Sequence, residues 1–170
     1  MTTLLRASMV EVRTLSYLLH PPLLDRMGLD IALRAYLDGF FRRTGIQVDL
    51  EMPPDATPLP RTVELVLFRV IQEALTNVWR HSGSATARVQ LANEPSQGGH
   101  RMTLSIEDFG KGIPTHIRDS MLSGRRSQAP VGLGLVGMRE RLQQIDGKLE
   151  IDSTMGNTVI RAIVKVAAAS

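Results

Sequence analysis

One short stretch of the sequence places three polar side chains on a common helical stripe. Glu73, Asn77 and His81 stand four residues apart, and at about 100° per residue this spacing keeps them on one side of a helix. A polar stripe of this kind is often only a solvated face. A carboxylate and an amide one turn apart can also position Mg²⁺ and its waters, because Mg²⁺ takes oxygen ligands and keeps much of its hydration shell.

A carboxylate near the end of a predicted strand is the second candidate group. Asp108 stands there, and Gly110 and Gly112 follow it at alternate positions. Glycine lets the backbone turn sharply and lets a flat ligand approach it closely. The simpler interpretation of the segment is a tight turn that binds nothing.

The third candidate is a run of glycines, Gly132, Gly134 and Gly137, which opens a predicted helix. Free N–H groups at a helix N-terminus, together with the helix dipole, form an anion site. Close packing of the helix against a neighbour would explain the same glycines. Each of the three patterns is therefore weak when it is taken alone.

The periodicity of the sequence predicts the elements that position these groups. Gly45 is the expected C-cap of one helix, and the buried stripe of the helix that carries Glu73 is formed by Leu67, Ile71, Leu75 and Val78. Helices are predicted over residues 3–19, 29–44, 61–81 and 134–145, and strands over 46–52, 85–91, 101–107, 148–153 and 158–166. The aperiodic stretch 110–131 is long for a loop, and its part from 113 to 131 is predicted to be a lid that nucleotide orders.

Strands and helices do not alternate one for one, which disfavours a doubly wound parallel sheet. The predicted fold class is α+β, a two-layer α/β sandwich in which a mixed sheet carries helices on one face. A chain of 170 residues with 43% apolar and 22% charged residues is expected to form one core. The absence of cysteine excludes thiol catalysis and Cys-ligated zinc, and it suits a reducing cytoplasm.

The charge pattern argues against direct binding of nucleic acid. The net charge is +3, and the basic residues are scattered apart from two arginine pairs, so they form no continuous stripe. No run of about 18 apolar residues and no signal-peptide pattern occurs. The chain as given is therefore predicted to be soluble.

The order of the motifs is more specific than any one of them. Glu-x-x-x-Asn, Asp-x-Gly-x-Gly, a Gly-x-Gly-x-x-Gly helix start and Gly-x-Thr occur in turn over residues 73–164. This order resembles the ATP site shared by histidine kinases, gyrase-type ATPases and Hsp90-type chaperones. Residues 134–141 are similar to the second glycine box of nitrate-sensor-type sensor kinases, which act on helix-turn-helix response regulators. Residues 19–29, with Leu-His-Pro and a later Gly-Leu, are similar to the join between the dimerisation helices and the catalytic domain of those kinases.

The resemblance implies two parts and a set of roles. Residues 1–22 would end a dimerisation helix and its linker, and residues 23–170 would form the ATP-binding catalytic domain. The family's roles fall on these residues of the chain: Asp108 accepts the adenine amino group, Gly110 and Gly112 let the base approach, Asn77 binds Mg²⁺, Glu73 orients or deprotonates a reacting group, Arg80, His81, Gly132 and Gly134 surround the phosphates, and Thr158 closes the adenine side.

Two positions depart from the family pattern. Phe109 stands where the family usually has Asn, which is expected to change the solvation of the base edge. Asn157 replaces a glycine before Thr158. Because Asn tolerates the left-handed conformation, the turn is expected to survive.

The implied function is transfer of the ATP γ-phosphoryl group to a histidine on a segment outside this chain. His20 is expected to belong to a linker rather than to accept phosphate. The implied partners are the phosphoacceptor helix of the same kinase, with homodimerisation of the parent, and a helix-turn-helix response regulator. The domain would be cytoplasmic, with or without a membrane anchor in the parent. The alternatives are an anti-sigma-type serine kinase and a nucleotide-binding module without transfer activity.

Overall fold

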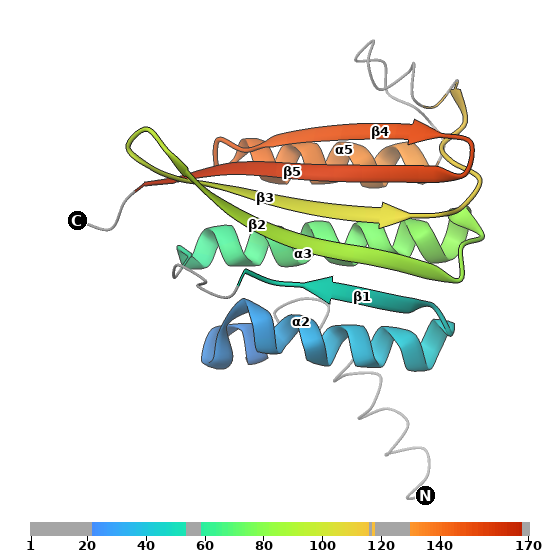
Figure 1. The fold of residues 1–170 in the computed structure, drawn as a ribbon, viewed down its shortest axis with the longest axis horizontal. Helices are drawn as coiled ribbons and strands as arrows, with labels where there is room; N and C mark the ends of the chain where they lie inside the picture. The colour runs from blue at the N-terminus through green and yellow to red at the C-terminus, as the bar shows by residue number, and fades with distance from the viewer. Residues whose placement is uncertain (1–21, 54–58, 116, 118–129, 168–170) are drawn as a thin grey trace, which may run out of the picture.

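The computed structural model describes residues 22–53, 59–115, 117 and 130–167. They form one sheet and one layer of helices (Figure 1). The elements in chain order are α2 (Pro22–Thr44), β1 (Gln47–Glu51), α3 (Arg61–Asn77), the π-helical turn η1 (Val78–Ser82), β2 (Thr86–Ser96), β3 (Gly99–Asp108), α5 (Pro130–Gln143), β4 (Lys148–Thr154) and β5 (Asn157–Ala167). Among the described residues, no helix is both long and apolar enough to span a membrane.

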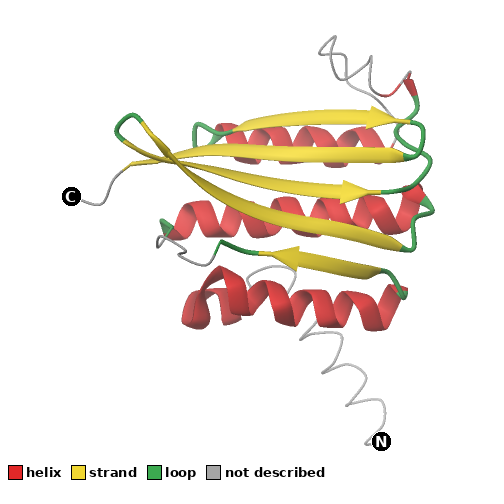
Figure 2. Ribbon diagram, in the orientation of Figure 1, coloured by secondary structure: helices red, strands yellow, loops and turns green. Residues whose placement is uncertain are grey.

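The sheet is mixed, as the sequence predicted. Its strand order is β1-β2-β3-β5-β4; β1 runs parallel to β2, and the other neighbouring pairs are antiparallel. Helices α2, α3 and α5 lie side by side on one face of the sheet (Figure 2). The predicted two-layer α/β sandwich is confirmed.

Helix α3 lies in the middle of the core. Leu67, Ile71 and Leu75 have no exposed surface and Val78 is 4% exposed, so the predicted buried stripe is confirmed. The α-helix ends at Asn77, and the chain continues as the wider π turn before Gly83, whose φ is +73°, ends it. Sequence periodicity predicted one helix to residue 81 and did not predict the π turn. Such turns are frequent at functional sites.

The face of the sheet opposite the helices is polar. On β2, Arg88 lies within 4 Å of carboxylates on both neighbouring strands, at 3.9 Å from Asp49, 3.8 Å from Glu51 and 3.7 Å from Glu107. Gln90 donates a hydrogen bond of 2.9 Å to Glu51. Side chains that interact across strands in this way stabilise a sheet face in water, so a second helix layer is not needed.

Several predicted boundaries needed correction. Residues 29–44 are helical, and Gly45, with φ +74°, donates from its N–H to the Phe41 carbonyl at 2.8 Å, which confirms it as the C-cap. Strands β2 and β3 extend further toward their common turn than predicted. Helix α5 begins at Pro130 rather than Gly134, because proline fits the first helical turn, where no intrahelical donor is needed. The predicted helix 3–19, His20 and most of the predicted lid lie outside the described residues.

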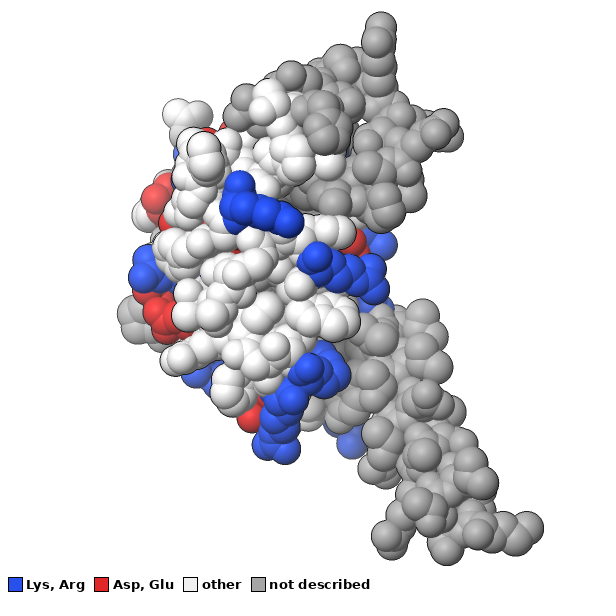
Figure 3. All heavy atoms as spheres, turned by 90° about the vertical axis from the view of Figure 1, so that its right-hand side faces the viewer, with Lys and Arg blue, Asp and Glu red and all other residues white. Residues whose placement is uncertain are grey.

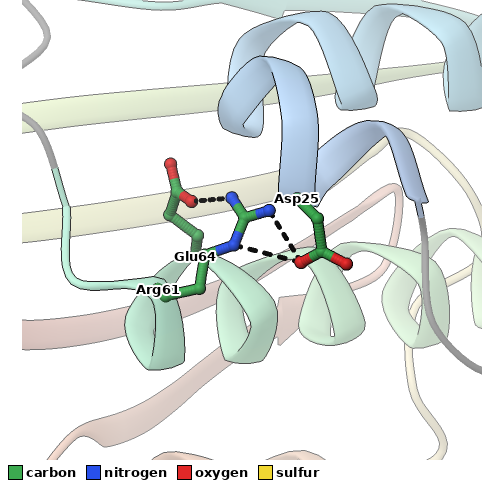
Figure 4. Close-up of polar contacts among 3 residues, drawn as sticks. All are labelled: Asp25, Arg61 and Glu64. Atoms are coloured by element: carbon green, nitrogen blue, oxygen red, sulfur yellow. Dashed lines mark hydrogen bonds and ion pairs between the residues drawn. The ribbon is translucent and has the colours of Figure 1, made fainter.

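One ion-pair cluster joins the first turn of α2 to the first turn of α3 (Figure 4). Arg61 donates two hydrogen bonds to one oxygen of Asp25, at 2.7 and 3.2 Å, and one of 2.6 Å to Glu64. Gly28 follows Asp25 in α2, and its φ of +79° interrupts the helix. The cluster therefore ties the segment before this kink to the start of α3.

We expect Arg61→Met to lower the free energy of unfolding by about 1 kcal/mol or less, since the ion pairs are partly exposed. Methionine keeps the apolar stem and removes the guanidinium. The effect should shrink in high salt, which screens such pairs. Arg42→Met is the matched control, because its pair with Asp38 is more exposed and lies within one helix. Urea unfolding at two salt concentrations measures both; a larger loss for Arg42→Met would contradict the prediction.

Candidate functional site

The end of α3, the turn η1 and the end of β3 lie at the same end of the domain (Figure 1). Residues of these elements line an open cavity. The cavity itself has a volume of about 40 Å³, and about 440 Å³ of empty space is reached when the open solvent at its mouth is included. Its apolar lining is Ala74, Val78, Ile106, Ile113, Leu135 and Ile160. Its polar lining is Asn77, His81, Ser82, Asp108 and Thr158, with Gly112 beside them. A mostly apolar concave site with a few polar groups is the usual form of a small-molecule pocket.

Asp108 provides the buried charge of this cavity. It is the last residue of β3 and is 6% exposed. Burial raises the pKa of its carboxyl above the ordinary value, and hydrogen bonds from the Gly110 N–H and the Ser82 hydroxyl oppose this shift, whereas the charge of Glu107 adds to it. The Gly110 bond measures 3.0 Å. The group is thus a desolvated hydrogen-bond acceptor in an otherwise apolar slot.

The two glycines after Asp108 are required by close backbone approach. A Cβ at Gly110 would collide with the backbone of Ser82, and one at Gly112 would collide with the Thr154 carbonyl. Gly112 also has φ +81°, which side chains other than glycine rarely adopt. The prediction of a sharp turn at this point is confirmed.

Thr158 stands opposite Asp108 in the β3–β5 register. It is 4% exposed, and its hydroxyl lies 3.0 Å from the Ser153 hydroxyl. Ser153 in turn accepts the Ile113 N–H at 2.8 Å. This chain of hydrogen bonds fixes the cavity wall on the side away from α3.

Glu73 and Asn77 converge on Gly134, in the second turn of α5. A Cβ at Gly134 would collide with the Glu73 carboxylate and would lie 3.5 Å from the Asn77 amide nitrogen. That nitrogen is buried and has no hydrogen-bond partner among the described residues. Because an unsatisfied buried amide costs free energy, this side chain is suited to a ligand that completes its contacts.

The remaining predicted residues lie around this centre. His81 lines the cavity. Arg80 is exposed, and its guanidinium lies 5.9 Å from the centre of the Trp79 ring. Gly132 is in the first turn of α5, where backbone N–H groups are unpaired. Figure 3 shows this end of the domain, with basic side chains spread over a largely uncharged face and few acidic ones in view.

The predicted site residues thus form two groups in the structure, those that line the cavity and those that lie beside it. Asn77, His81, Asp108, Gly112 and Thr158 line one cavity. Of the other described residues, Glu73 and Gly134 meet beside it, Gly110 packs on Ser82, and Arg80 is exposed.

The structure shows where both departures from the family pattern lie. Phe109 is 47% exposed and does not line the cavity, and its effect on the solvation of the base edge stays a prediction. Gly156, with φ +96°, and not Asn157 adopts the positive φ in the β4–β5 turn. Asn157 instead begins β5 and donates a hydrogen bond of 2.7 Å to Glu107. The explanation from left-handed Asn was wrong, although the turn is retained.

Sequence reasoning missed the two buried serines, Ser82 and Ser153, and the apolar lining. The apolar residues of β3 and β5 could have been found from strand alternation, since Ile106 and Ile160 face the helices. Nothing in the local sequence marks either serine, because the partners that connect them to the rest of the site are distant in the chain: Lys111 and Asp108 for Ser82, and Ile113 for Ser153.

An apolar slot with one buried acceptor suits a flat heteroaromatic ring, and the free N–H groups of α5 suit an anionic group. Fold and site together thus define a nucleotide-binding domain. The sequence model of the histidine kinase-, DNA gyrase B-, and HSP90-like ATPases matches residues 62–168, and the chain belongs to this family.

Two relatives show which members of this family the chain resembles in sequence. It is 38% identical over 160 residues to the sensor histidine kinase MctS of Rhizobium johnstonii, covering 94% of this chain and 32% of MctS. It is 33% identical over 153 residues to the oxygen sensor histidine kinase NreB of Staphylococcus carnosus, covering 88% of this chain and 40% of NreB. The chain thus spans well under half of these relatives.

A solved structure agrees in fold. The histidine kinase domain of the blue-light activated kinase EL346 of Erythrobacter litoralis superposes with a TM-score of 0.61 at 20% identity, over 80% of this chain and 64% of that one.

Proposed function

We propose that this chain binds Mg-ATP and donates the γ-phosphoryl group to a histidine of a sensor histidine kinase. The observation that carries the proposal is the convergence of Glu73 and Asn77 on Gly134, beside a cavity with one buried carboxylate. The sensor-kinase names of the relatives support the histidine acceptor.

The cavity would take the adenine base. Asp108 would accept a hydrogen bond from the amino group of the base, while Ile106 and Ile160 contact its faces. Gly110 and Gly112 give the backbone room beside it, and Thr158 closes the far side. Guanine presents a carbonyl at the position of the adenine amino group, so a buried carboxylate would repel it.

The phosphates would lie between α3 and the start of α5. The first N–H groups of α5 around Gly132 point out of the helix, and the helix dipole favours anions there. His81 and Arg80 would contribute positive or hydrogen-bonding groups at the mouth. The scarcity of acidic side chains in the view of this face (Figure 3) fits an anionic ligand.

The residues fit Mg²⁺ carried on the phosphates. Among the described residues no cluster of three or more His, Cys, Asp or Glu could hold a metal by itself. Mg²⁺ commonly binds through one or two protein oxygens together with substrate phosphates and water. Asn77 would supply such an oxygen, and its unpartnered amide would gain contacts with the phosphates or their water. The ion would neutralise phosphate charge.

Transfer would then depend on Glu73. The phosphoryl group leaves ADP and forms a bond to an imidazole nitrogen of the acceptor. Glu73 would orient that imidazole and accept its N–H proton. Because phosphoryl transfer relies mainly on positioning and charge neutralisation, the domain can hold ATP without an acceptor present. The acceptor helix of the same kinase, in a homodimeric parent, and a helix-turn-helix response regulator are the proposed partners, and the cytoplasm is the proposed location.

The decisive experiment compares this chain alone with the chain joined to the acceptor-bearing segment of MctS. With radiolabelled Mg-ATP, we expect an acid-labile phosphoryl group on the joined protein and no stable label on the chain alone. ATP binding without transfer in both would favour a nucleotide-binding module. An acid-stable label on a serine of a captured partner would favour an anti-sigma-type kinase.

A further inference from the structure

Ser82 joins the end of the α3 helix to the turn that follows Asp108. It is the last residue of η1, it is 8% exposed, and it lines the cavity. A π turn contains more residues than an α turn of the same rise. The π turn after Asn77 therefore changes which residues face the cavity, and Ser82 is the buried polar residue at its end.

The hydroxyl of Ser82 interacts with three groups. It donates a hydrogen bond of 2.9 Å to the Val78 carbonyl and accepts the Ser84 N–H at 3.0 Å. It also favours the charged form of Asp108 and so lowers the pKa of that carboxyl. A hydroxyl has a single hydrogen, so donation to Asp108 requires the hydroxyl to turn away from the Val78 carbonyl. The carboxylate, as a charged acceptor, forms the stronger of the two bonds.

The backbone of Ser82 holds the same turn from the other side. Its carbonyl accepts the Lys111 N–H at 2.9 Å. Gly110 packs so closely on Ser82 that a Cβ there would collide with the Ser82 carbonyl. Gly110 meanwhile donates its own N–H to Asp108 at 3.0 Å. Asp108, Gly110 and Lys111 are thus all fixed relative to one residue of η1.

We propose that Ser82 is the positioning residue for adenine recognition: its hydroxyl orients the Asp108 carboxylate, and its carbonyl holds the turn against which the base lies. The proposal rests on the proposed function, since it assumes that the cavity takes adenine. It links the phosphate side of the site to the base side, because Asn77 immediately precedes η1.

The hydroxyl also affects when Asp108 is charged. Removing a hydrogen bond to the charged form should raise the pKa of Asp108 further. The other titratable groups near it are Glu107 on β3, His81 on η1 and Lys111 in the turn, whereas β5 and α5 present Thr158 and Leu135. Only the charged carboxylate accepts two hydrogen bonds well, so protonation of Asp108 should weaken ATP binding. Without the Ser82 hydroxyl this protonation should occur at a higher pH, and ATP affinity should therefore begin to fall at a higher pH as the solution is acidified.

The test is calorimetric titration of Ser82→Ala with Mg-ATP and Mg-ITP over a range of pH. ITP carries a carbonyl in place of the adenine amino group. We expect ATP affinity to fall by about 2- to 12-fold, the equivalent of one ordinary hydrogen bond, with ITP affinity unchanged. The pH at which ATP affinity is half lost should rise. Ser84→Ala is the matched control, since the Ser84 hydroxyl contacts the backbone of Thr86 and Phe109 but not Asp108.

Equal losses for ATP and ITP, or an unchanged pH profile in a folded Ser82→Ala protein, would overturn the proposal. If Ser82→Ala fails to fold, Ser82→Cys provides the test, because cysteine keeps the volume of the side chain and its thiol is a weaker hydrogen-bond donor than the hydroxyl. ATP affinity and the pH profile should change in the same directions as expected for Ser82→Ala. Affinities and a pH profile equal to those of the wild-type chain would refute the role of the hydroxyl. Failure of the wild-type chain to prefer ATP over ITP would instead refute the proposed adenine site itself.

Discussion

Replacing Asp108 with alanine is expected to weaken ATP binding by about 10- to 150-fold while the domain stays folded. The carboxylate is 6% exposed and lies in an apolar slot, so its bond to the adenine amino group would be a charged hydrogen bond away from water. Such bonds contribute about 1.5 to 3 kcal/mol, and 1.4 kcal/mol corresponds to about a tenfold change in affinity. Titration with ATP and GTP measures the loss.

GTP is the internal control for this variant. It should bind poorly to the parent chain and lose little more in Asp108→Ala, because the carboxylate offers it no bond. An equal loss for both nucleotides, or an unchanged ATP affinity, would remove Asp108 from the base site.

Asp108→Asn should increase the stability of the fold at neutral pH. The folded-state pKa of Asp108 lies above the ordinary value of 3.8, chiefly because of burial. Its contribution to stability is complete below pH 3.8 and is lost as pH rises through the folded-state pKa. At neutral pH the charged form therefore costs stability, and asparagine removes that cost while it can still accept the Gly110 N–H. Urea unfolding of both proteins at neutral and acid pH should show a gain only at neutral pH; a gain that is equal at acid pH would contradict this reasoning.

The sequence contains enough information for the elements and for most of the site because both depend on local periodicity. The stripe of Leu67, Ile71 and Leu75 determines which side of α3 is buried, and it therefore also determines that Glu73 and Asn77 lie on another side of the helix. The strand alternation before Asp108 and the glycines after it indicate a turn at the end of a strand. These inferences need only neighbours in the chain, and the structure agrees with them.

The features that escaped prediction depend on contacts between distant residues. The π turn at Val78–Ser82 has the same composition as an ordinary helix end. Its last residue is held by Lys111 and Asp108, more than 25 residues further along the chain. The sequence prediction for Asn157 used the tolerance of asparagine for the left-handed conformation. In the structure its side chain instead donates a hydrogen bond to Glu107 on the adjacent strand. A single sequence does not show such partners.

The largest effect is expected for Glu73→Gln, measured as phosphoryl transfer in the chain joined to an acceptor segment. Glutamine keeps the size of the side chain and its place beside Gly134, but it cannot accept the imidazole proton. Loss of a general base lowers rates by about 10²- to 10⁴-fold. ATP affinity should remain near that of the parent, since Glu73 does not line the base cavity. Glu140→Gln, an exposed carboxylate on α5, is the matched control and should leave the rate unchanged.

Gly134→Ala separates the role of Glu73 in transfer from a role in binding. An added methyl group would collide with the Glu73 carboxylate and approach the Asn77 amide, so both side chains must move. If Asn77 holds the ion and phosphates while Glu73 acts on the acceptor, Gly134→Ala should lose ATP affinity as well as transfer, whereas Glu73→Gln should lose transfer alone. Loss of ATP affinity to the same extent in both variants would mean that Glu73 serves the nucleotide rather than the acceptor. A transfer rate in Glu73→Gln within a few-fold of the parent would exclude Glu73 as the base.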